Sequence, residues 1–181
     1  MVDEAHARIH LVVLFGGESA EHDVSCTTAA HVLRAADPER YRITPVGIST
    51  EGQWALAEQA AAALLAGPDS IPGRLDPTGT DVSPTPMLAD AAASQEVTVV
   101  LPLLHGPMGE DGTVQGLLDL ANVPYVGSGV LGSAVAMDKA MAKQVLTAAG
   151  IPQARYRAFA EHEMTPALPA RLATELGLPV F

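Results

Sequence analysis

Cysteine and lysine are scarce in this chain of 181 residues. Cys26 is the single cysteine, so no disulfide can form within the chain, and this indicates a reducing compartment. The first residues are acidic and lack the apolar core of a secretory signal. The longest uncharged apolar runs are far shorter than a membrane span. We therefore expect a cytoplasmic protein that does not associate with membranes.

Positive charge is also scarce, and its distribution is uneven. Ten Lys and Arg residues stand against 21 Asp and Glu residues, which gives a formal net charge of −11. No Lys or Arg occurs between Arg74 and Lys139, and the only lysines are Lys139 and Lys143. Because clustered cations hold the phosphates of nucleic acids, we expect no nucleic-acid partner.

Hydrophobic residues make up 48% of the chain and charged residues 17%, which excludes intrinsic disorder. The uninterrupted apolar segment 9–15 is typical of a strand buried on both faces of a parallel sheet. A helical pattern follows it, with Ser19 as the expected cap. Further patterns predict strands at 42–48, 53–56, 97–101 and 123–126, and helices at 58–65 and 113–120. This alternation predicts an α/β fold with an open parallel sheet.

Two regions depart from that alternation. Residues 66–95 are rich in Pro, Gly, Ser and Thr, which predicts a long surface insertion with a weak helix at its end. After Gly127 the pattern predicts one long helix over 130–149, a strand at 155–159, a helix at 165–176 and the start of a strand at 178–181. Because the chain stops inside an apolar strand pattern, we expect it to be a fragment.

Two glycine-rich loops, 16–23 and 105–112, follow the carboxyl ends of predicted strands, where open α/β sheets bind ligands. Neither loop has the glycine spacing of a dinucleotide-binding motif or a P-loop. Glu21 either complements a helix dipole or anchors a substrate amine. His105 either bonds a nearby carbonyl or contacts a ligand, and Glu110 and Asp111 most simply cap the next helix.

The other candidates carry weaker signals. Lys139 and Lys143 lie four residues apart, on one helical face that is either solvated or in contact with a phosphate. Cys26 is expected to be a packed small hydrophobe rather than a nucleophile. The remaining histidines do not form a metal-binding pattern; they are His6, His10, His22, His31 and His162.

Four motifs occur in a fixed order along the chain. They are FGGESAEHDVS at 15–25, LHGPMGEDGTVQG at 104–116, VPYVGSG at 123–129 and AMDK at 136–139. In this order they resemble the bacterial D-alanine–D-alanine ligases, and the resemblance extends over essentially the whole chain to the closing LGLPVF. The segment 66–95 resembles the longer insertion of some members of that family.

The resemblance implies a fold and a set of site residues. Residues 1–127 would form a Rossmann-like substrate domain, and residues 128–181 would begin an ATP-grasp domain. Glu21 matches the carboxylate that holds the ammonium of the first D-alanine, and Val24 lies where its small side chain packs. His105 matches a histidine near its carboxylate, and Lys139 matches a lysine that approaches the ATP phosphates.

The resemblance also implies a reaction: ATP-dependent ligation of two D-alanines through an acyl phosphate, for peptidoglycan precursor synthesis. Its Mg²⁺ (or Mn²⁺) ligands would lie beyond Phe181, so we expect no metal ligands in this chain and no activity from it alone. A homodimer is implied as well. The alternatives are a D-alanine–D-lactate or D-alanine–D-serine ligase, or a non-catalytic α/β binding domain.

Overall fold

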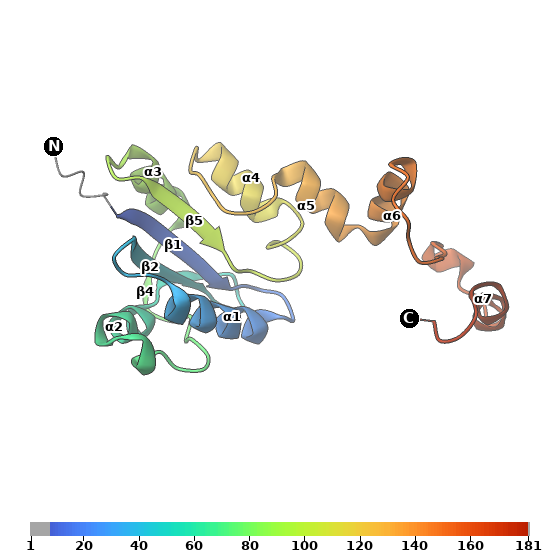
Figure 1. Cartoon of the computed structure of the whole chain (residues 1–181), viewed down its shortest axis with the longest axis horizontal. Helices are drawn as coiled ribbons and strands as arrows, with labels where there is room; N and C mark the ends of the chain where they lie inside the picture. The colour runs from blue at the N-terminus through green and yellow to red at the C-terminus, as the bar shows by residue number, and fades with distance from the viewer. Residues whose placement is uncertain (1–7, 181) are drawn as a thin grey trace. The chain divides into compact units, whose positions relative to one another are not determined.

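A computed structural model describes residues 8–180 and divides the chain into two compact units, one ending at Met137 and the other starting at Asp138 (Figure 1). The sequence places the change of domain at 127/128, whereas the first unit extends ten residues further and includes the helix α5 (Val130–Met137). No helix within 8–180 is both long enough and apolar enough to span a membrane.

A five-stranded sheet forms the centre of the first unit, with the strand order β4-β3-β2-β1-β5. β1 lies between β2 and β5 and is parallel to both, while β3 and β4 extend the far edge in antiparallel pairings. The strands are β1 (Ile9–Gly16), β2 (Tyr41–Ile48), β3 (Trp54–Leu56), β4 (Thr80–Asp81) and β5 (Thr98–Pro102). The predicted open α/β sheet is therefore confirmed.

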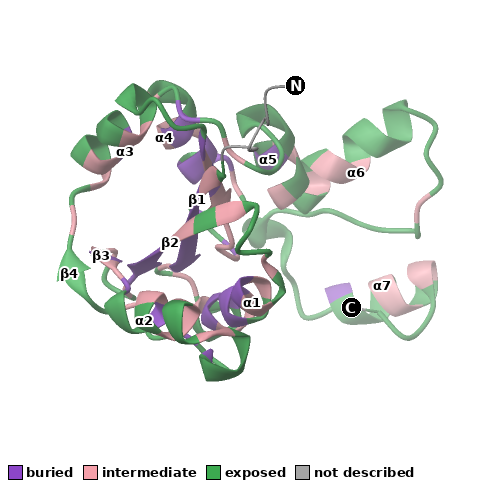
Figure 2. Cartoon of the chain, turned by 60° about the vertical axis from the view of Figure 1, so that its left-hand side comes forward, coloured by how far each residue is buried: buried purple, intermediate pink, exposed green. Residues whose placement is uncertain are grey.

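Helices cover both faces of this sheet (Figures 1 and 2). Alternate residues of β1 point to opposite faces: Val13 and Phe15 pack with α1 and α2, and Val12 and Leu14 pack with α3 and α4. This double burial explains why the sequence of β1 is apolar without interruption. The helices are α1 (His22–Ala35), α2 (Glu58–Ala66), α3 (Pro84–Ala93) and α4 (Thr113–Leu120).

The segment 66–95 ends in a helix, α3, as predicted, but it is not a surface insertion throughout. It also contains a 3₁₀ turn (Pro68–Ser70) and the edge strand β4, and it buries Ile71, Leu75 and Leu88, so that part of the prediction was wrong. The backbone of Pro77 passes so close to Gly47 that a Cβ added there would lie 2.1 Å from the Pro77 carbonyl oxygen. The apolar residues scattered among the turn formers are therefore core residues.

Residues 123–126, predicted as a strand, make only an isolated bridge between Tyr125 and Val100 of β5. Two backbone hydrogen bonds support it, from Val100 N–H to the Pro124 oxygen and from Val126 N–H to the Val100 oxygen. Pro124 has no N–H to donate, so a longer ladder is not available at this position.

The long helix predicted over 130–149 is divided into α5 and α6 (Lys139–Ala148). Asp138 stands between them in extended conformation, and its carboxylate accepts hydrogen bonds from the N–H groups of Ala140 and Met141 at 2.9 and 3.0 Å. Asp138 is thus the N-cap of a new helix rather than an interior residue.

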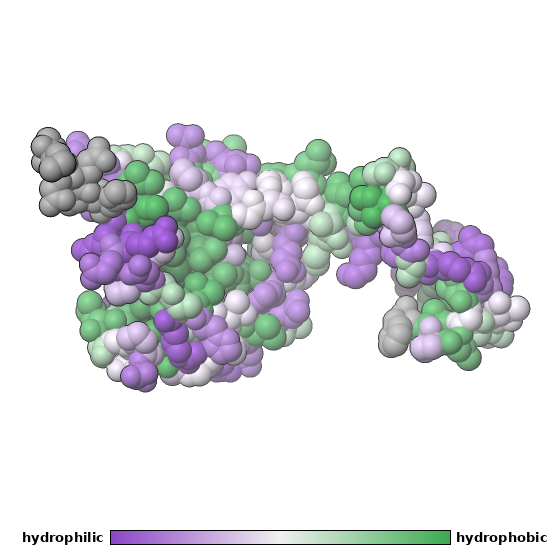
Figure 3. Space-filling model, in the orientation of Figure 1, coloured by the Kyte–Doolittle hydropathy of each residue, from purple (hydrophilic) through white to green (hydrophobic). Residues whose placement is uncertain are grey.

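The second unit has little buried apolar surface of its own. Among its described residues, 138–180, Leu168 is the single buried hydrophobic side chain, and Figure 3 shows hydrophobic patches at the surface over α6 and α7 (Leu168–Leu176). The strand predicted at 155–159 is irregular, and none of 178–180 is in a strand; Phe181 lies outside the described residues. A 3₁₀ turn spans Glu161–Glu163.

Candidate functional site

The candidate site lies at the carboxyl ends of β1 and β5. From β1 the chain continues through α1 to β2, which lies beside β1 on one side of the sheet. β5 lies beside β1 on the other side. The strand order therefore reverses at β1. Open α/β sheets bind ligands in the crevice at such a switch point. The loops 17–21 and 103–112 enter this crevice.

Ser25 fastens the first turn of α1 to both strand ends. Its buried hydroxyl accepts a hydrogen bond from Gly16 N–H at 2.8 Å and donates one to the Leu103 oxygen at 2.6 Å. Leu103 N–H in turn donates to the Leu14 oxygen at 2.8 Å. The start of α1 is therefore fixed relative to the carboxyl ends of β1 and β5.

Ser19 connects the two loops instead of capping α1 as predicted. The N-cap position is Glu21, and Ser19 Oγ donates to the backbone oxygen of His105 at 2.7 Å. Gly106 then passes beneath Glu21 with a φ of +72°, and a Cβ added to it would lie 3.1 Å from Glu21 Oε2. The carboxylate of Glu21 is thus close to the backbone of the second loop, and the positive φ together with this contact favours glycine at position 106.

The ring of His105 lies between two polar side chains. Its Nε2 is 3.2 Å from the hydroxyl oxygen of Thr28 on α1, and its Nδ1 is 3.8 Å from Glu110 Oε1. Glu110 also accepts a hydrogen bond from Gly106 N–H at 2.8 Å through its other oxygen. His105 is therefore oriented from both sides, by α1 and by its own loop.

Asp111 shapes the end of the second loop. Its two oxygens accept from Met108 N–H at 2.9 Å and Thr113 N–H at 3.0 Å, and Met108 adopts a φ of +68°. The hydrogen bond from Met108 and those around Thr113 hold the pKa of Asp111 below its ordinary value. Asp111 accepts from the first N–H group of α4, but the N-cap is Gly112 and no side chain caps this helix, so neither Asp111 nor Glu110 is the cap that was predicted.

Gln115 holds the same loop from within α4. Its Nε2 donates to the Gly109 oxygen at 2.9 Å, and the residue is 6% exposed. Its Oε1 is buried and has no hydrogen-bond partner among the described residues. A buried acceptor of this kind calls for a donor from water or a ligand.

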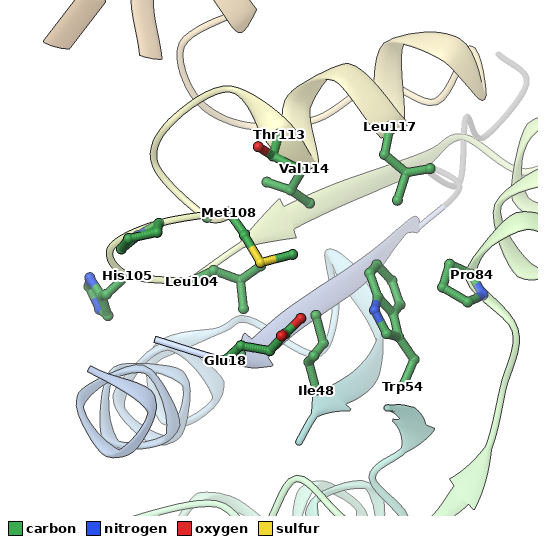
Figure 4. A pocket seen from close by; sticks show the side chains of 13 residues that line it. Glu18, Ile48, Trp54, Pro84, Leu104, His105, Met108, Thr113, Val114 and Leu117 are labelled. Carbon is green, nitrogen blue, oxygen red and sulfur yellow. The ribbon is translucent and has the colours of Figure 1, made fainter. Parts of the chain in front are cut away.

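An apolar cavity of about 170 Å³ lies beside the site (Figure 4). Trp54, Leu104, Met108 and Leu117 face it, and the carboxylate of Glu18 points into it. His105 lies at its edge with its ring turned away from these side chains. Glu21 and Val24 do not line the cavity, so of the predicted substrate residues only His105 borders it.

Of the predicted residues, Glu21, Val24 and His105 lie in the first unit, Glu21 and Val24 after β1 and His105 after β5. Glu21 and Val24 are exposed, and Val24 retains 52% of its accessible surface. Thr28 was not predicted, although its spacing from Glu21 and Val24 (i, i+3, i+7) places all three on one face of α1. That periodicity is the signal that identifies it.

Lys139 belongs to the second unit, where it is exposed at the first position of α6. Lys143 lies 5.2 Å above the ring of Tyr156 and is therefore not a freely solvated cation. Lys143, Arg155 and Arg157 line a cavity of about 610 Å³ in this unit. The two arginines were not predicted as site residues, and Arg157 forms an ion pair with Glu175.

Two other predicted groups have structural roles. Cys26 is 1% exposed, and burial raises the pKa of its thiol to about 11, so it is a packed small residue as predicted. His10 lies between the hydroxyls of Thr44 and Thr98, and burial lowers its pKa. Within 8–180 no three His, Cys, Asp or Glu residues gather to form a metal site, and His6 lies outside that range.

These features define an open α/β domain with an exposed carboxylate and an oriented histidine at its switch point. Residues 10–128 match the family model described as the D-ala D-ala ligase N-terminus. The chain is 45% identical to a D-alanine–D-alanine ligase of Mycolicibacterium vanbaalenii, over 97% of this chain and 50% of that protein. It is 48% identical to the ligase of Deinococcus radiodurans, over 94% and 48%. The chain therefore belongs to the D-alanine–D-alanine ligase family.

Solved structures agree with this assignment. The D-alanine–D-alanine ligase of Coxiella burnetii aligns with a TM-score of 0.71 and 34% identity, over 94% of this chain and 50% of that one. The VanG D-Ala:D-Ser ligase of Enterococcus faecalis aligns with a TM-score of 0.64 and 30% identity, over 96% and 50%. The chain spans about half the length of the relatives that it matches.

Proposed function

We propose that this chain is the part of a D-alanine–D-alanine ligase that binds the first D-alanine. The observation that supports the proposal best is that the Glu21 and His105 loops are joined at the ends of β1 and β5, with the Glu21 carboxylate close to Gly106, the residue after His105. A D-amino acid carries an ammonium and a carboxylate on one carbon, and these two side chains complement both charges.

Glu21 is the proposed anchor of the ammonium group. Glu21 is exposed, and Gly106, which lies close to its carboxylate, has no side chain to cover it. The exposed Val24, one helical turn further along α1, would face the methyl group of the substrate. Holding the amine in this way orients the carboxylate for reaction.

His105 is the proposed partner of the substrate carboxylate. Thr28 and Glu110 hold its ring, so less side-chain freedom is lost when a ligand binds. The loop that carries it is fixed by Asp111 and Gln115. A rigid loop preserves the distance between the proposed ammonium and carboxylate sites.

ATP is the proposed second substrate, and it would phosphorylate the D-alanine carboxylate before the amine of a second D-alanine displaces the phosphate. Lys139, an exposed cation on α6, has the charge needed to approach its phosphates. The described residues offer no cluster suited to Mg²⁺ or Mn²⁺, so no step in this chain is assigned to a metal. Peptidoglycan precursor synthesis and a homodimer belong to the same proposal.

A ligase that accepts D-serine is the second candidate, supported by the similarity to the VanG D-Ala:D-Ser ligase. Both functions use the same first substrate, so the residues of the first unit are compatible with either. Competition between D-alanine, D-serine and D-lactate for the second position distinguishes them in the full-length protein.

The proposal is tested by titrating the chain with D-alanine while its amide NMR signals are recorded. We expect shifts at the loops 17–21 and 103–112, and we expect Glu21→Gln to weaken binding about tenfold or more, because a charge-assisted bond to the ammonium contributes roughly 1.5–3 kcal/mol. Glu18→Gln is the matched control, since it removes a neighbouring carboxylate that faces the apolar cavity. L-Alanine is the control for stereochemistry.

Equal affinities of the wild-type chain and Glu21→Gln would contradict the assignment of Glu21. Binding of L-alanine as strongly as D-alanine would contradict the proposed substrate. An absence of shifts in both loops at saturating D-alanine would contradict the proposed location of the site.

A further inference from the structure

The apolar cavity beside the candidate site has the volume of a single aromatic ring. It measures about 170 Å³, and an apolar cavity of about 150 Å³ in another protein binds benzene. Trp54, Leu104, Met108 and Leu117 form its apolar walls (Figure 4). Because Met108 and Glu18 are exposed, the cavity opens to solvent on their side, and a small ligand can enter it there.

Backbone contacts hold the walls of this cavity in place. Gly109 packs so closely on Leu104 that an added Cβ would lie 2.5 Å from Leu104 Cβ. Met108 keeps its positive φ while its N–H donates to the carboxylate of Asp111 at 2.9 Å. A ligand that enters a cavity with ordered walls loses less free energy to the ordering of side chains and loops.

A single carboxylate, that of Glu18, stands at the mouth of the cavity. It points inward, and a Cβ added to Gly52 would lie 2.6 Å from Glu18 Oε1, so this side chain rests on the backbone of Gly52. Within 8–180 the carboxylate of Glu18 forms no ion pair. None of the described residues that line the cavity is Lys or Arg, and His105 turns its ring away. The negative charge of Glu18 is therefore not compensated by a cation of the cavity wall.

Trp54 favours a ligand of the same charge. The face of an indole ring is electrostatically negative and attracts cations more strongly than the face of any other side chain. A cation attached to an apolar ring would therefore be attracted by Glu18 and Trp54 while its ring is buried. An anion of the same size would meet the carboxylate of Glu18 at the entrance.

We propose that this cavity is a second binding site, which takes a primary organic ammonium that carries one ring-sized apolar group. The apolar group would lie among Leu104, Met108 and Leu117, and the ammonium would pair with Glu18 at the mouth. The site is distinct from the proposed D-alanine site, because Glu21 and Val24 do not line it. The inference rests on the geometry and charge of the cavity and does not depend on the proposed function.

Trp54 is the only tryptophan of the chain, so its fluorescence and its indole ¹H–¹⁵N signal report on this cavity. The chain is titrated at about pH 7.5 with benzylamine, which is protonated at that pH like other alkyl amines, and with the uncharged benzyl alcohol and the anionic benzoate. We expect saturable changes at Trp54 and an affinity for benzylamine about three- to tenfold above that for benzyl alcohol. Benzoate should bind more weakly than both.

Glu18→Gln removes the charge at the mouth and keeps the size of the side chain. It should weaken the binding of benzylamine by roughly two- to fivefold, the range of an exposed ion pair, and leave that of benzyl alcohol unchanged. Glu51→Gln is the matched control, because Glu51 is exposed beside Gly52, accepts from Thr50 Oγ1 at 2.7 Å and does not line the cavity. This control should keep the wild-type ratio of the two affinities.

Equal affinities of the wild-type chain for benzylamine and benzyl alcohol would overturn the proposed ligand class. So would a ratio that Glu18→Gln leaves unaltered. An absence of saturable changes at Trp54 with all three compounds would overturn the site itself, a result that requires no variant to fold. D-Alanine added to the benzylamine complex should leave the bound amine in place, and displacement of the amine would show that the cavity is not a separate site.

Discussion

The loop that carries His105 depends on a few acceptor atoms that each satisfy a backbone donor. Asp111 uses its two oxygens for two different N–H groups, and Glu110 uses one of its oxygens for Gly106. Backbone groups in a loop have no sheet or helix ladder to pair with, so these carboxylates provide the pairing. The shape of the loop is therefore set by acidic side chains rather than by apolar packing alone.

This arrangement predicts a pH-dependent role for Asp111. Its folded pKa is lowered, so its ionised form stabilises the fold above the ordinary value of about 3.8. The contribution is lost as the pH falls through the lower folded value. Asp111→Asn keeps an acceptor for only one of the two donors. The free energy of unfolding of this variant should be below that of the wild-type chain at pH 7, and the difference should shrink below about pH 4.

Chemical denaturation at a series of pH values measures this difference. Asp69→Asn, at an exposed carboxylate in a 3₁₀ turn, is the control and should have little effect. A constant difference between the wild-type chain and Asp111→Asn from pH 7 to pH 3 would contradict the assigned role of ionisation.

Elements of the first unit are connected at their ends by buried polar groups. Ser25 links α1 to the last residue of β1 and to the residue that follows β5. A serine in the first turn of a helix usually faces solvent or its own backbone. Here the hydroxyl of Ser25 joins α1 to the ends of β1 and β5. Its position in the sequence alone does not indicate that role.

Ser25→Ala should destabilise the first unit by about 2 kcal/mol or more, because it leaves the buried Gly16 N–H and Leu103 oxygen without this partner. Urea denaturation followed by circular dichroism measures the change. Ser70→Ala, at an exposed position, is the control. A change below about 0.5 kcal/mol would indicate that water replaces the hydroxyl.

The sequence predicts the elements of the first unit better than those of the second. β1, β2, β5, α1, α2 and α4 are found close to their predicted bounds, because each has an uninterrupted or periodic apolar pattern and a partner in the same unit. A strand is defined by the strand beside it. The segment 155–159 alternates arginine with aromatic or apolar residues, as a strand does, but no described segment pairs with it.

The candidate site, like the fold, was predicted only in part. The loops that carry Glu21 and His105 follow from their places after two parallel strands, since that position is fixed by topology, whereas the roles of the two residues are implied only by the family resemblance. Ser25 and Thr28 act through contacts with residues 78 and 77 positions away in the sequence, although periodicity places Thr28 on the face of Val24. Gln115 contacts Gly109, six residues away, across an irregular loop. Local sequence patterns do not indicate which residues form such tertiary contacts.

At the scale of the whole molecule, the two units differ in how much apolar surface each buries. The first contains two hydrophobic clusters on opposite faces of its sheet. In the second, the described residues bury Leu168 and leave Met141, Val145 and Ile151 exposed. Local stability follows buried apolar contact, so the two units should not be equally stable.

Hydrogen exchange followed by mass spectrometry tests this difference. We expect the amides of β1 and β2 to be protected for far longer than those of α6 and α7 under native conditions. A peptide from α2 is the internal control for helix length, because α2 is as short as α7 but packs on the sheet. The protection of its amides should resemble that of β1 more than that of α7. Equal protection of β1 and α7 would contradict the expected difference.

The cap at Asp138 has a consequence for how the ATP of the proposed function would approach α6. The first N–H groups of a helix carry a partial positive charge and commonly receive an anion. In α6 the N–H groups of Ala140 and Met141 already bond a carboxylate of this chain. The carboxylate of Asp138 therefore already balances the partial positive charge at this end of α6. An incoming triphosphate would therefore meet a fixed negative charge beside Lys139, and the attraction would depend on the lysine side chain and not on the helix.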